Sequence, residues 1–301
     1  PGSLATAEHV ARAIVAGGAV PNVDFGFSYN AVVNLEASGQ GSLEQFIINA
    51  NNVAGANAMY FVPAVPTNAS DGGGNDWWSL MLSTALPAVT GDATTFDGTA
   101  HASTDGATVR SDNSAALGAA VAPGLDGAYT TPTLDPEFEI VGDRSGTPVW
   151  DGLDIRADDV TVRNLAIYGF ADADAAVDAD FLFWSALEGV VEQAVVGGRA
   201  GSSVAAPFGD GSVEVGVAAF TSSTVTVLDS ILHFADTGVH SATTSAITVT
   251  GNEISSNAFT GISVGNTAAP AIIEGNFLSG NGSFGSIWVS EPTTIRDNTV
   301  R

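Results

Sequence analysis

The sequence predicts an all-β fold, a parallel β-helix (β-solenoid) with a short N-terminal capping helix, and three observations indicate it. A polar residue recurs at intervals of 22, 24 and 22 positions, as Ser230, Asn252, Asn276 and Asn298. Glycine recurs at similar intervals, at positions 216, 238, 261 and 285. Between these markers apolar and polar residues alternate, as a strand with one buried face requires. Such units are typical of the coils of a parallel β-helix, which stack about 4.8 Å apart.

The first expected element is an amphipathic helix within residues 41–52, GSLEQFIINANN. Ser42 can cap its N-terminus, and Gln45 stands where a capping box places its second residue. One apolar face is expected, made of Leu43, Phe46, Ile47 and Ala50. This helix is expected to cover the first coil, whose backbone groups would otherwise lack partners. A short strand, YFVP, and a loop, NASDGGGNDWW, are expected to follow.

The coils are expected to be clear from about residue 150 onward. Two earlier segments fit the same frame, with apolar positions at Val160, Val162, Leu165 and Ile167 and, less clearly, at Val191, Ala194 and Val196. The asparagines at 252, 276 and 298 are predicted to point inward as a hydrogen-bonded ladder; exposed turn asparagines are the alternative. Glu274 and Arg296 are expected to form a cross-coil ion pair worth about 0–1 kcal/mol.

The N-terminal part carries a resemblance to a known family. AVVNLEASGQGSLEQFIINAN, followed by AMYFVP, resembles the opening of bacterial secreted or surface right-handed parallel β-helix repeat proteins, which have a GSLRQAI-type N-terminal capping helix. Glu44 stands where that motif has Arg. The resemblance spans residues 23–301 and implies a right-handed solenoid in a secreted or surface-anchored bacterial protein without an assigned activity.

Two regions are expected along the chain. Residues 1–30 are predicted to be an N-terminal tail or the end of a preceding β-module, because VDFGFSYN (23–30) resembles the closing strand of a small β-sandwich. Residues 31–301 are predicted to form the solenoid, with a capping segment at 31–63 and a last coil that stops midway. The first residue is Pro, so a processed piece of a longer precursor is expected.

Composition excludes several classes of protein. The chain has 33 acidic and 8 basic residues, all eight of them Arg, and a formal charge of −25, which disfavours binding to nucleic acid. No apolar run is long enough for a membrane span. The absence of Cys excludes disulfides and thiolate metal sites. The acidity fits an extracellular protein, a salty environment or binding of divalent cations, and composition does not choose among these.

The acidic residues cluster in two segments, 151–159 and 172–180. Their spacing predicts that Asp158 stacks near Asp180 and Asp151 near Asp174, on successive coils. Calcium is the one cofactor that the sequence suggests, because carboxylate oxygens suit it. Its candidate ligands are Asp172, Asp174, Asp178 and Asp180. Solvated acidic turns are the alternative.

Catalytic signals are weak. If the chain is an enzyme, the candidate residues are Asp174, Asp178 and Arg163, which would act on a polysaccharide. Trp77 and Trp78 are candidates for stacking on sugar rings, and packing of a loop against the solenoid is the alternative. His233 and His240 are a further candidate metal pair, with ordinary turn histidines as the alternative.

The function expected from these observations is an extracellular structural or adhesive β-solenoid, at the bacterial cell surface. A filament or stalk subunit that self-associates through its chain ends is one form of it. The alternative is a β-helix that binds or degrades a polysaccharide, as a lyase, hydrolase or epimerase does.

Overall fold

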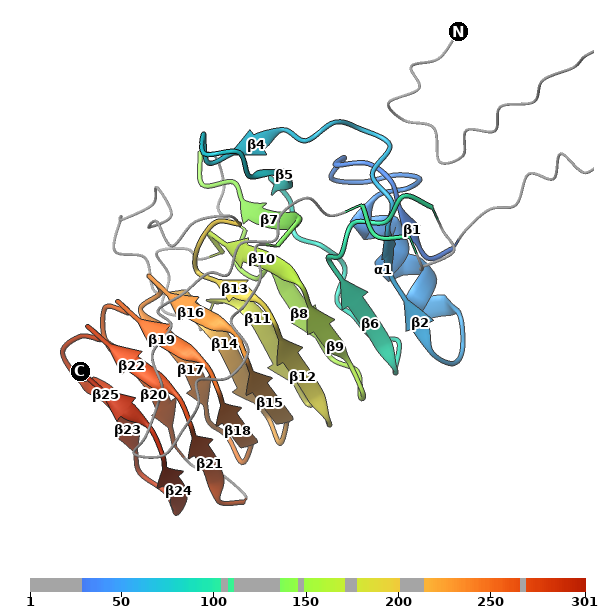
Figure 1. Cartoon of the computed structure of the whole chain (residues 1–301). Coiled ribbons are helices and arrows are strands. Elements are labelled where there is room, and N and C mark those ends of the chain that lie inside the picture. Colours follow the sequence, from blue (N-terminus) through green and yellow to red (C-terminus); the bar gives the residue numbers. More distant parts are fainter. Residues whose placement is uncertain are drawn as a thin grey trace, which may run out of the picture.

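The computed structural model describes residues 29–103, 108–110, 136–145, 149–170, 178–200, 214–265 and 269–301. The predicted fold is confirmed: the described residues form a right-handed parallel β-helix with one short helix at its N-terminal end. Figure 1 shows the coils stacked from this helix to the C-terminus. Nearly all of the predicted tail (1–30), and also Asp172 and Asp174, lie outside the described residues.

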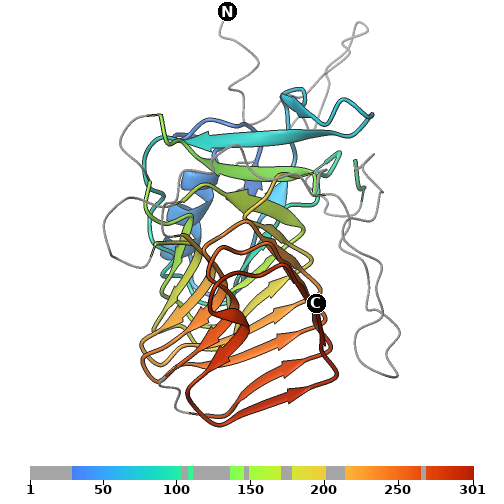
Figure 2. The same cartoon turned by 90° about the vertical axis from the view of Figure 1, so that its left-hand side faces the viewer.

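In the described part of the chain, three sheets form the walls of the solenoid, and Figure 2, seen from the side of the C-terminal coils, shows their strands nested one behind another. The eight-stranded sheet contains β2 (Asn57–Ala58), β6 (Thr94–Asp97), β9 (Thr161–Arg163), β12 (Gly189–Glu192), β15 (Thr224–Leu228), β18 (Ala246–Thr250), β21 (Ala271–Glu274) and β24 (Thr293–Arg296). The nine-stranded sheet contains β4 (Ala69–Ser70), β5 (Asp76–Leu82), β7 (Phe138–Gly142), β10 (Leu165–Tyr168), β13 (Val195–Val196), β16 (Ile231–His233), β19 (Glu253–Ser255), β22 (Phe277–Ser279) and β25 (Thr299–Val300). The six-stranded sheet contains β8 (Leu153–Ile155), β11 (Asp178–Trp184), β14 (Glu214–Phe220), β17 (Thr237–Ser241), β20 (Thr260–Val264) and β23 (Gly285–Val289).

The core is built from apolar columns that run along the solenoid. One column pairs Val162 with Val191, Val227, Val249 and Ile273 in turn, on the eight-stranded sheet, and all five are fully buried. The apolar positions predicted before residue 200 therefore belong to the same frame as the C-terminal repeats. Each strand inside a sheet also pairs its backbone with the coils on both sides, which leaves few amides without partners.

The helix α1 (Leu43–Asn52) lies at the N-terminal end of the solenoid (Figure 1). Its predicted apolar face is buried, and the ring of Phe46 meets that of Phe96 edge to face at 5.4 Å. Ser42 Oγ accepts a hydrogen bond from Gln45 N at 3.2 Å, as a capping residue does. The reciprocal half of the capping box is absent, because the Gln45 side chain donates to Asn49 Oδ1 instead. Within the described residues, no helix has the length and apolar character to cross a membrane.

Polar ladders line the corners between sheets. Asn252 Nδ2 donates to Asn276 Oδ1 at 3.0 Å, and Asn276 Nδ2 donates to Asn298 Oδ1 at 2.9 Å. A second ladder joins Asn257 to Asn281 at 3.0 Å. These side chains bind backbone groups that leave the strand ladders at each bend, so the bends stay buried without orphaned amides.

In the six coils from β9 to β24, the residue that directly follows the strand of the eight-stranded sheet has a left-handed backbone. The φ angles at this column lie between 46° and 69°, at Asn164, Gln193, Asp229, Gly251, Gly275 and Asp297. Asn, Asp and Gly adopt this conformation at least cost, which explains their recurrence in the repeat.

Coil length varies along the chain, and this corrects the predicted stacking of acids. Ladder contacts join residues 22 or 24 apart in the C-terminal coils, but 28 or 29 apart around Asp151 and Asp158. Asp158 therefore lies beside Leu187 and not Asp180. Asp151 lies beside Ala179, and its expected neighbour Asp174 is outside the described residues. The predicted spacing of 22 to 23 residues was wrong here because this coil contains extra residues.

Candidate ligand-binding site

The tryptophans predicted to stack on sugars are buried. Trp77 and Trp78 lie in β5, which forms an antiparallel hairpin with β4 within the segment NASDGGGNDWW. Their side chains are 1% and 2% exposed. Trp78 packs against Phe61 in the core and donates a hydrogen bond to the backbone oxygen of Val65. Neither indole offers a face to a ligand, so this prediction was wrong, and the alternative of packing holds.

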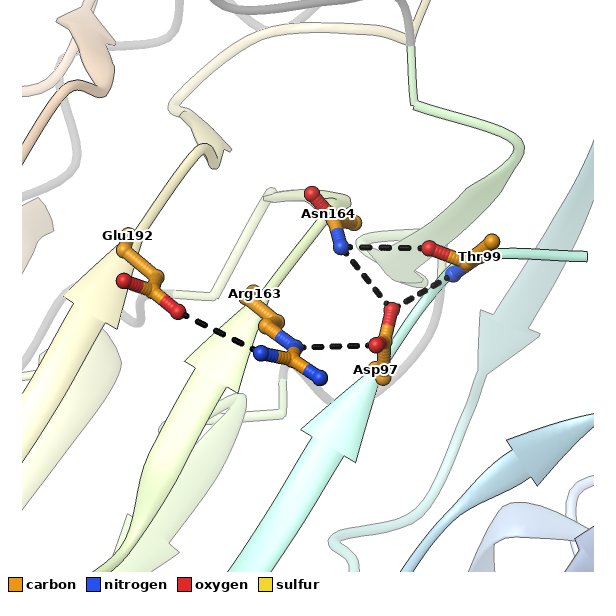
Figure 3. Close-up of polar contacts among 5 residues, drawn as sticks. All are labelled: Asp97, Thr99, Arg163, Asn164 and Glu192. Carbon is orange, nitrogen blue, oxygen red and sulfur yellow. Dashed lines mark hydrogen bonds and ion pairs between the residues drawn. The ribbon is translucent and has the colours of Figure 1, made fainter. Parts of the chain in front are cut away.

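Two of the three residues proposed for catalysis, Arg163 and Asp178, lie on different sheets, and the third, Asp174, is outside the described residues. Arg163 is in β9 of the eight-stranded sheet, whereas Asp178 is in β11 of the six-stranded sheet. Arg163 instead joins a charge ladder across three coils, shown in Figure 3. Its Nε donates to Asp97 Oδ2 at 2.8 Å, and its Nη1 lies 3.6 Å from Glu192 Oε1.

Asp97 has a full set of partners in this ladder. Its Oδ1 accepts from Thr99 N and from Asn164 Nδ2, both at 3.0 Å. Burial alone would raise the pKa of Asp97, but these hydrogen bonds and the charge of Arg163 outweigh it and lower the pKa. The ladder therefore braces neighbouring coils and leaves no acid or base for chemistry. The predicted pair of Glu274 and Arg296, at 2.6 Å, stands in the same column further along the sheet.

The histidines and the calcium candidates do not form a metal centre in the described residues. His233 lies on the nine-stranded sheet and His240 on the six-stranded sheet. Asp178 and Asp180 are buried on β11, while the other two calcium candidates are outside the described residues. No group of three or more potential metal-binding side chains occurs among the residues described.

A pocket lies beside the start of β8, at a corner of the solenoid. It has a volume of about 560 Å³ and is lined by residues 83–86, which follow β5, and by residues 149–152 and 154. Its lining combines aliphatic side chains with two carboxylates, those of Asp151 and Asp154.

Asp151 is the most perturbed acid of the pocket. Burial raises its pKa to about 6, and the nearby carboxylates of Asp154 and Asp178 add to this effect. The backbone N–H of Ala179 donates to Asp151 Oδ1 at 3.2 Å and, with the charge of Arg156, opposes the shift only in part.

Asp154 has a cationic partner of its own. Arg156 Nε donates to both Asp154 oxygens, at 2.9 and 3.0 Å, and Arg156 Nη2 lies 2.8 Å from Asp154 Oδ2. Both residues are on the outer face of β8, since the intervening Ile155 is in the core. The pair therefore continues the polar surface from the pocket along the strand.

Two exposed tryptophans flank this strip. Trp150 lines the pocket and is 58% exposed. Trp184 ends β11, one residue beyond the pair of Phe183 with Ile155, and is 45% exposed. Its ring lies 6.1 Å from that of Phe220 on the next strand. The outer face of β8 and β11 thus presents an aromatic ring at each end of a polar strip, and we name residues 149–156 with Trp184 the β8 face.

A second cavity, of about 500 Å³, lies on the outer face of the nine-stranded sheet beside Glu139, Tyr168 and Arg199. Glu139 accepts hydrogen bonds from Ser79 Oγ at 2.6 Å and from Ala200 N at 2.9 Å. Burial nevertheless raises the pKa of Glu139, and burial with the Glu139 charge raises the pKa of Tyr168. Because the chain's own donors occupy Glu139, this cluster fastens Ala200 to the sheet and is less suited to a ligand.

Sequence reasoning found part of the β8 face and missed the rest. The sequence indicated 151–159 as an acidic segment, but it did not single out Trp150 or Trp184. A tryptophan directly before an Asp and a strand, in PVWDGLDI, is the signal that could have located the pocket.

Comparison with known families gives one match and no structural relative. A family model described as Periplasmic copper-binding protein (NosD) matches residues 209–301, less than half of the chain. The matched part contains β14 to β25, the most regular coils, and excludes the pocket and the β8 face. No solved structure matches the chain.

Proposed function

We propose that this solenoid is an extracellular adhesive scaffold that binds a polysaccharide on the β8 face. The observation that carries the proposal is the exposed indole of Trp150 on a 560 Å³ pocket that also holds Asp151 and Asp154. Flat apolar faces of sugar rings pack on aromatic rings, and sugar hydroxyls donate to carboxylates.

The shape of the β8 face favours an extended ligand over a small one. Trp150 precedes β8 and Trp184 ends β11, so the two rings lie toward opposite ends of neighbouring strands. Asp154 and Arg156 stand between them on the outer face of β8. A chain of several sugar units can contact all of these groups, because they are held on rigid strands.

The setting at the bacterial cell surface is part of the proposal. It is supported by the match to a family named periplasmic, and by α1, which forms in the segment that resembles secreted and surface β-helix proteins. Self-association through the chain ends and binding of calcium stay predictions.

Copper is not part of the proposed function, although the matching family is named for it. The matched residues contain no Cys and no Met, and their only histidines are His233 and His240. These two lie on different sheets, and His233 is buried against the ring of Phe234. Copper sites are built from converging imidazole, thiolate or thioether ligands, so the residues of this part do not fit one.

We propose binding and not cleavage. Cleavage of a glycosidic bond needs a second carboxylate as base or nucleophile beside the acid. Two carboxylates act on Asp151, those of Asp178 and Asp154. Asp178 is buried, at 3% exposed, and Arg156 Nε holds both oxygens of Asp154. A carboxylate so engaged is poorly placed to attack or to take a proton from water.

Retention on immobilised polysaccharides tests the proposal. The panel holds a neutral glucan, chitin, chitosan and a uronate polymer, and the variants are Trp150→Ala and Trp184→Ala. Loss of an aromatic anchor is expected to weaken binding about tenfold or more for Trp150→Ala. Trp288→Ala is the matched control, because Trp288 is as exposed as Trp184, at 45%, and lies on the same sheet, in β23.

Two results would contradict the proposal. If Trp288→Ala weakens retention as much as Trp150→Ala, the β8 face is not the site. If the wild-type protein is retained by no polymer of the panel, the proposed function is wrong.

A further inference from the structure

We infer that the polysaccharide that fits the β8 face is an amino-sugar polymer with free, protonated amines, and that Asp151 is the counter-ion of one of them. This inference rests on the proposed function, because it names the ligand class of the same pocket. The charged side chains that lie together at this pocket support the inference.

The pocket has an excess of negative charge. The carboxylates of Asp154 and Asp178 both act on Asp151, and Arg156 is the cation that acts on it among the described residues. Arg156 is already committed to Asp154 through both carboxylate oxygens. Asp151 therefore lacks a cationic partner of its own.

The hydrogen bonds of Asp151 also leave it open to a ligand. Ala179 N is the donor to its carboxylate within the described part of the chain, and it contacts Oδ1. The carboxylate lines the pocket beside Trp150, so a sugar ring stacked on the indole would bring its substituents near it. An ammonium substituent would donate a charge-assisted hydrogen bond to this carboxylate.

Other sugar classes fit the pocket less well. A uronate would bring a further negative charge to a site with three carboxylates, in a chain with a formal charge of −25. A neutral sugar would leave Asp151 without a counter-charge, and burial has already raised the pKa of Asp151 to about 6. An ammonium ion supplies the missing charge and would lower that pKa again.

Calorimetric titration with two oligosaccharides of equal length tests this inference. One is a chitosan oligosaccharide with free amines, and the other is its fully N-acetylated counterpart, which keeps the backbone and loses the charge. The wild-type protein is expected to bind the free amine form about tenfold more tightly, as one added ion pair in a pocket allows. Asp151→Asn should abolish this preference, and its amide oxygen can still accept from Ala179 N.

A matched variant separates the pocket from general attraction between an acidic protein and a cationic sugar. Glu274→Gln removes one negative charge from the eight-stranded sheet, away from the pocket, and should change the preference less than about twofold. If it abolishes the preference as Asp151→Asn does, the inference is wrong.

The remaining outcomes distinguish the inference from the proposed function. Equal binding of both oligosaccharides, or tighter binding of the N-acetylated one, overturns the inference and leaves the proposed function standing. If neither oligosaccharide binds while another polymer of the panel is retained, only the inference falls. If no polymer is retained, both fall.

Discussion

Burial without a compensating partner sets the behaviour of two titratable side chains, Asp151 and His233. Asp151 is buried near like charges, and its pKa is raised to about 6. His233 is 3% exposed, and burial lowers its pKa to about 4. Its Nε2 has no hydrogen-bond partner among the described residues, and its ring stacks on Phe234 at 4.3 Å. The Asp151 carboxyl lines a pocket and is available to a ligand. The His233 imidazole is enclosed, so its protonation affects only the free energy of unfolding.

His233 should make the protein sensitive to acid. An unfolded histidine takes up its proton near its ordinary pKa of 6.5, whereas folded His233 stays neutral until about pH 4. Its stabilising contribution is therefore present above pH 6.5 and is lost as the pH falls toward 4. Between pH 7 and 5 the free energy of unfolding should fall by about 2 kcal/mol because of this group. Urea unfolding of the wild type and of His233→Gln, at both pH values, measures the difference. Parallel pH dependences would contradict the assignment.

Single residues differ in how far the sequence could predict their roles. Ser42 and the asparagines at 252 and 276 were placed correctly, because their roles depend on local capping and on a fixed repeat. Trp77 and Trp78 were misplaced, because glycines before them suggested a loop where the chain forms a hairpin into β5. Arg163 pairs with Asp97, 66 residues away. A repeat of 22 residues would place these two residues three coils apart, whereas β6 and β9 are direct neighbours.

At the scale of the elements, each coil is held by the ladder at its bend as well as by its strands. Asn276 shows the arrangement. Its Nδ2 donates to Val249 O and to Asn298 Oδ1, and its Oδ1 accepts from the backbone and side chain of Asn252. One side chain thus connects three successive coils at a fully buried position.

Replacing this asparagine should destabilise the C-terminal coils. Asn276→Ala leaves the Asn252 amide and the Val249 carbonyl buried without these partners, and should lower the free energy of unfolding by about 2–3 kcal/mol. Thr248→Ala, on the outward side of β18, is the control and should cost less than about 1 kcal/mol. Chemical denaturation followed by circular dichroism measures both. Equal losses for the two variants would mean that the ladder adds no stability beyond that of an average position.

The neighbours of a residue on the adjacent coils were predictable in the regular coils and not in the irregular ones, for a physical reason. From β15 onward, each coil takes the same path, so a spacing of 22 to 24 residues fixes which residues are neighbours. Before β15, coils carry insertions, and contacts join residues 28, 29, 36 and 66 apart. Insertions leave the strand pairing intact and change only the corners. The acids of 151–159 were therefore recognised as a cluster but assigned to the wrong neighbours.

At the scale of the whole molecule, the regular coils and the proposed binding site lie in different parts of the solenoid. The regular coils from β14 to β25 are the part that matches a known family, and their polar columns brace one coil to the next. The pocket lies among the earlier, less regular coils, beside the start of β8. The solenoid thus supplies a rigid support, and the surface that we propose binds a ligand lies outside its regular part.

The most direct test of this account is oxidative footprinting of tryptophan side chains, read by mass spectrometry, with and without a bound oligosaccharide. The oligosaccharide is taken from the polymer that retains the wild-type protein, with chitosan as the first choice. Trp150, Trp184 and Trp288 are exposed, whereas Trp77 and Trp78 are buried, so the three exposed rings should be oxidised in the free protein. The account predicts that the ligand protects Trp150 and Trp184 and leaves Trp288 unchanged. Protection of Trp288 alone, or unchanged oxidation of Trp150 in the presence of bound ligand, would contradict it.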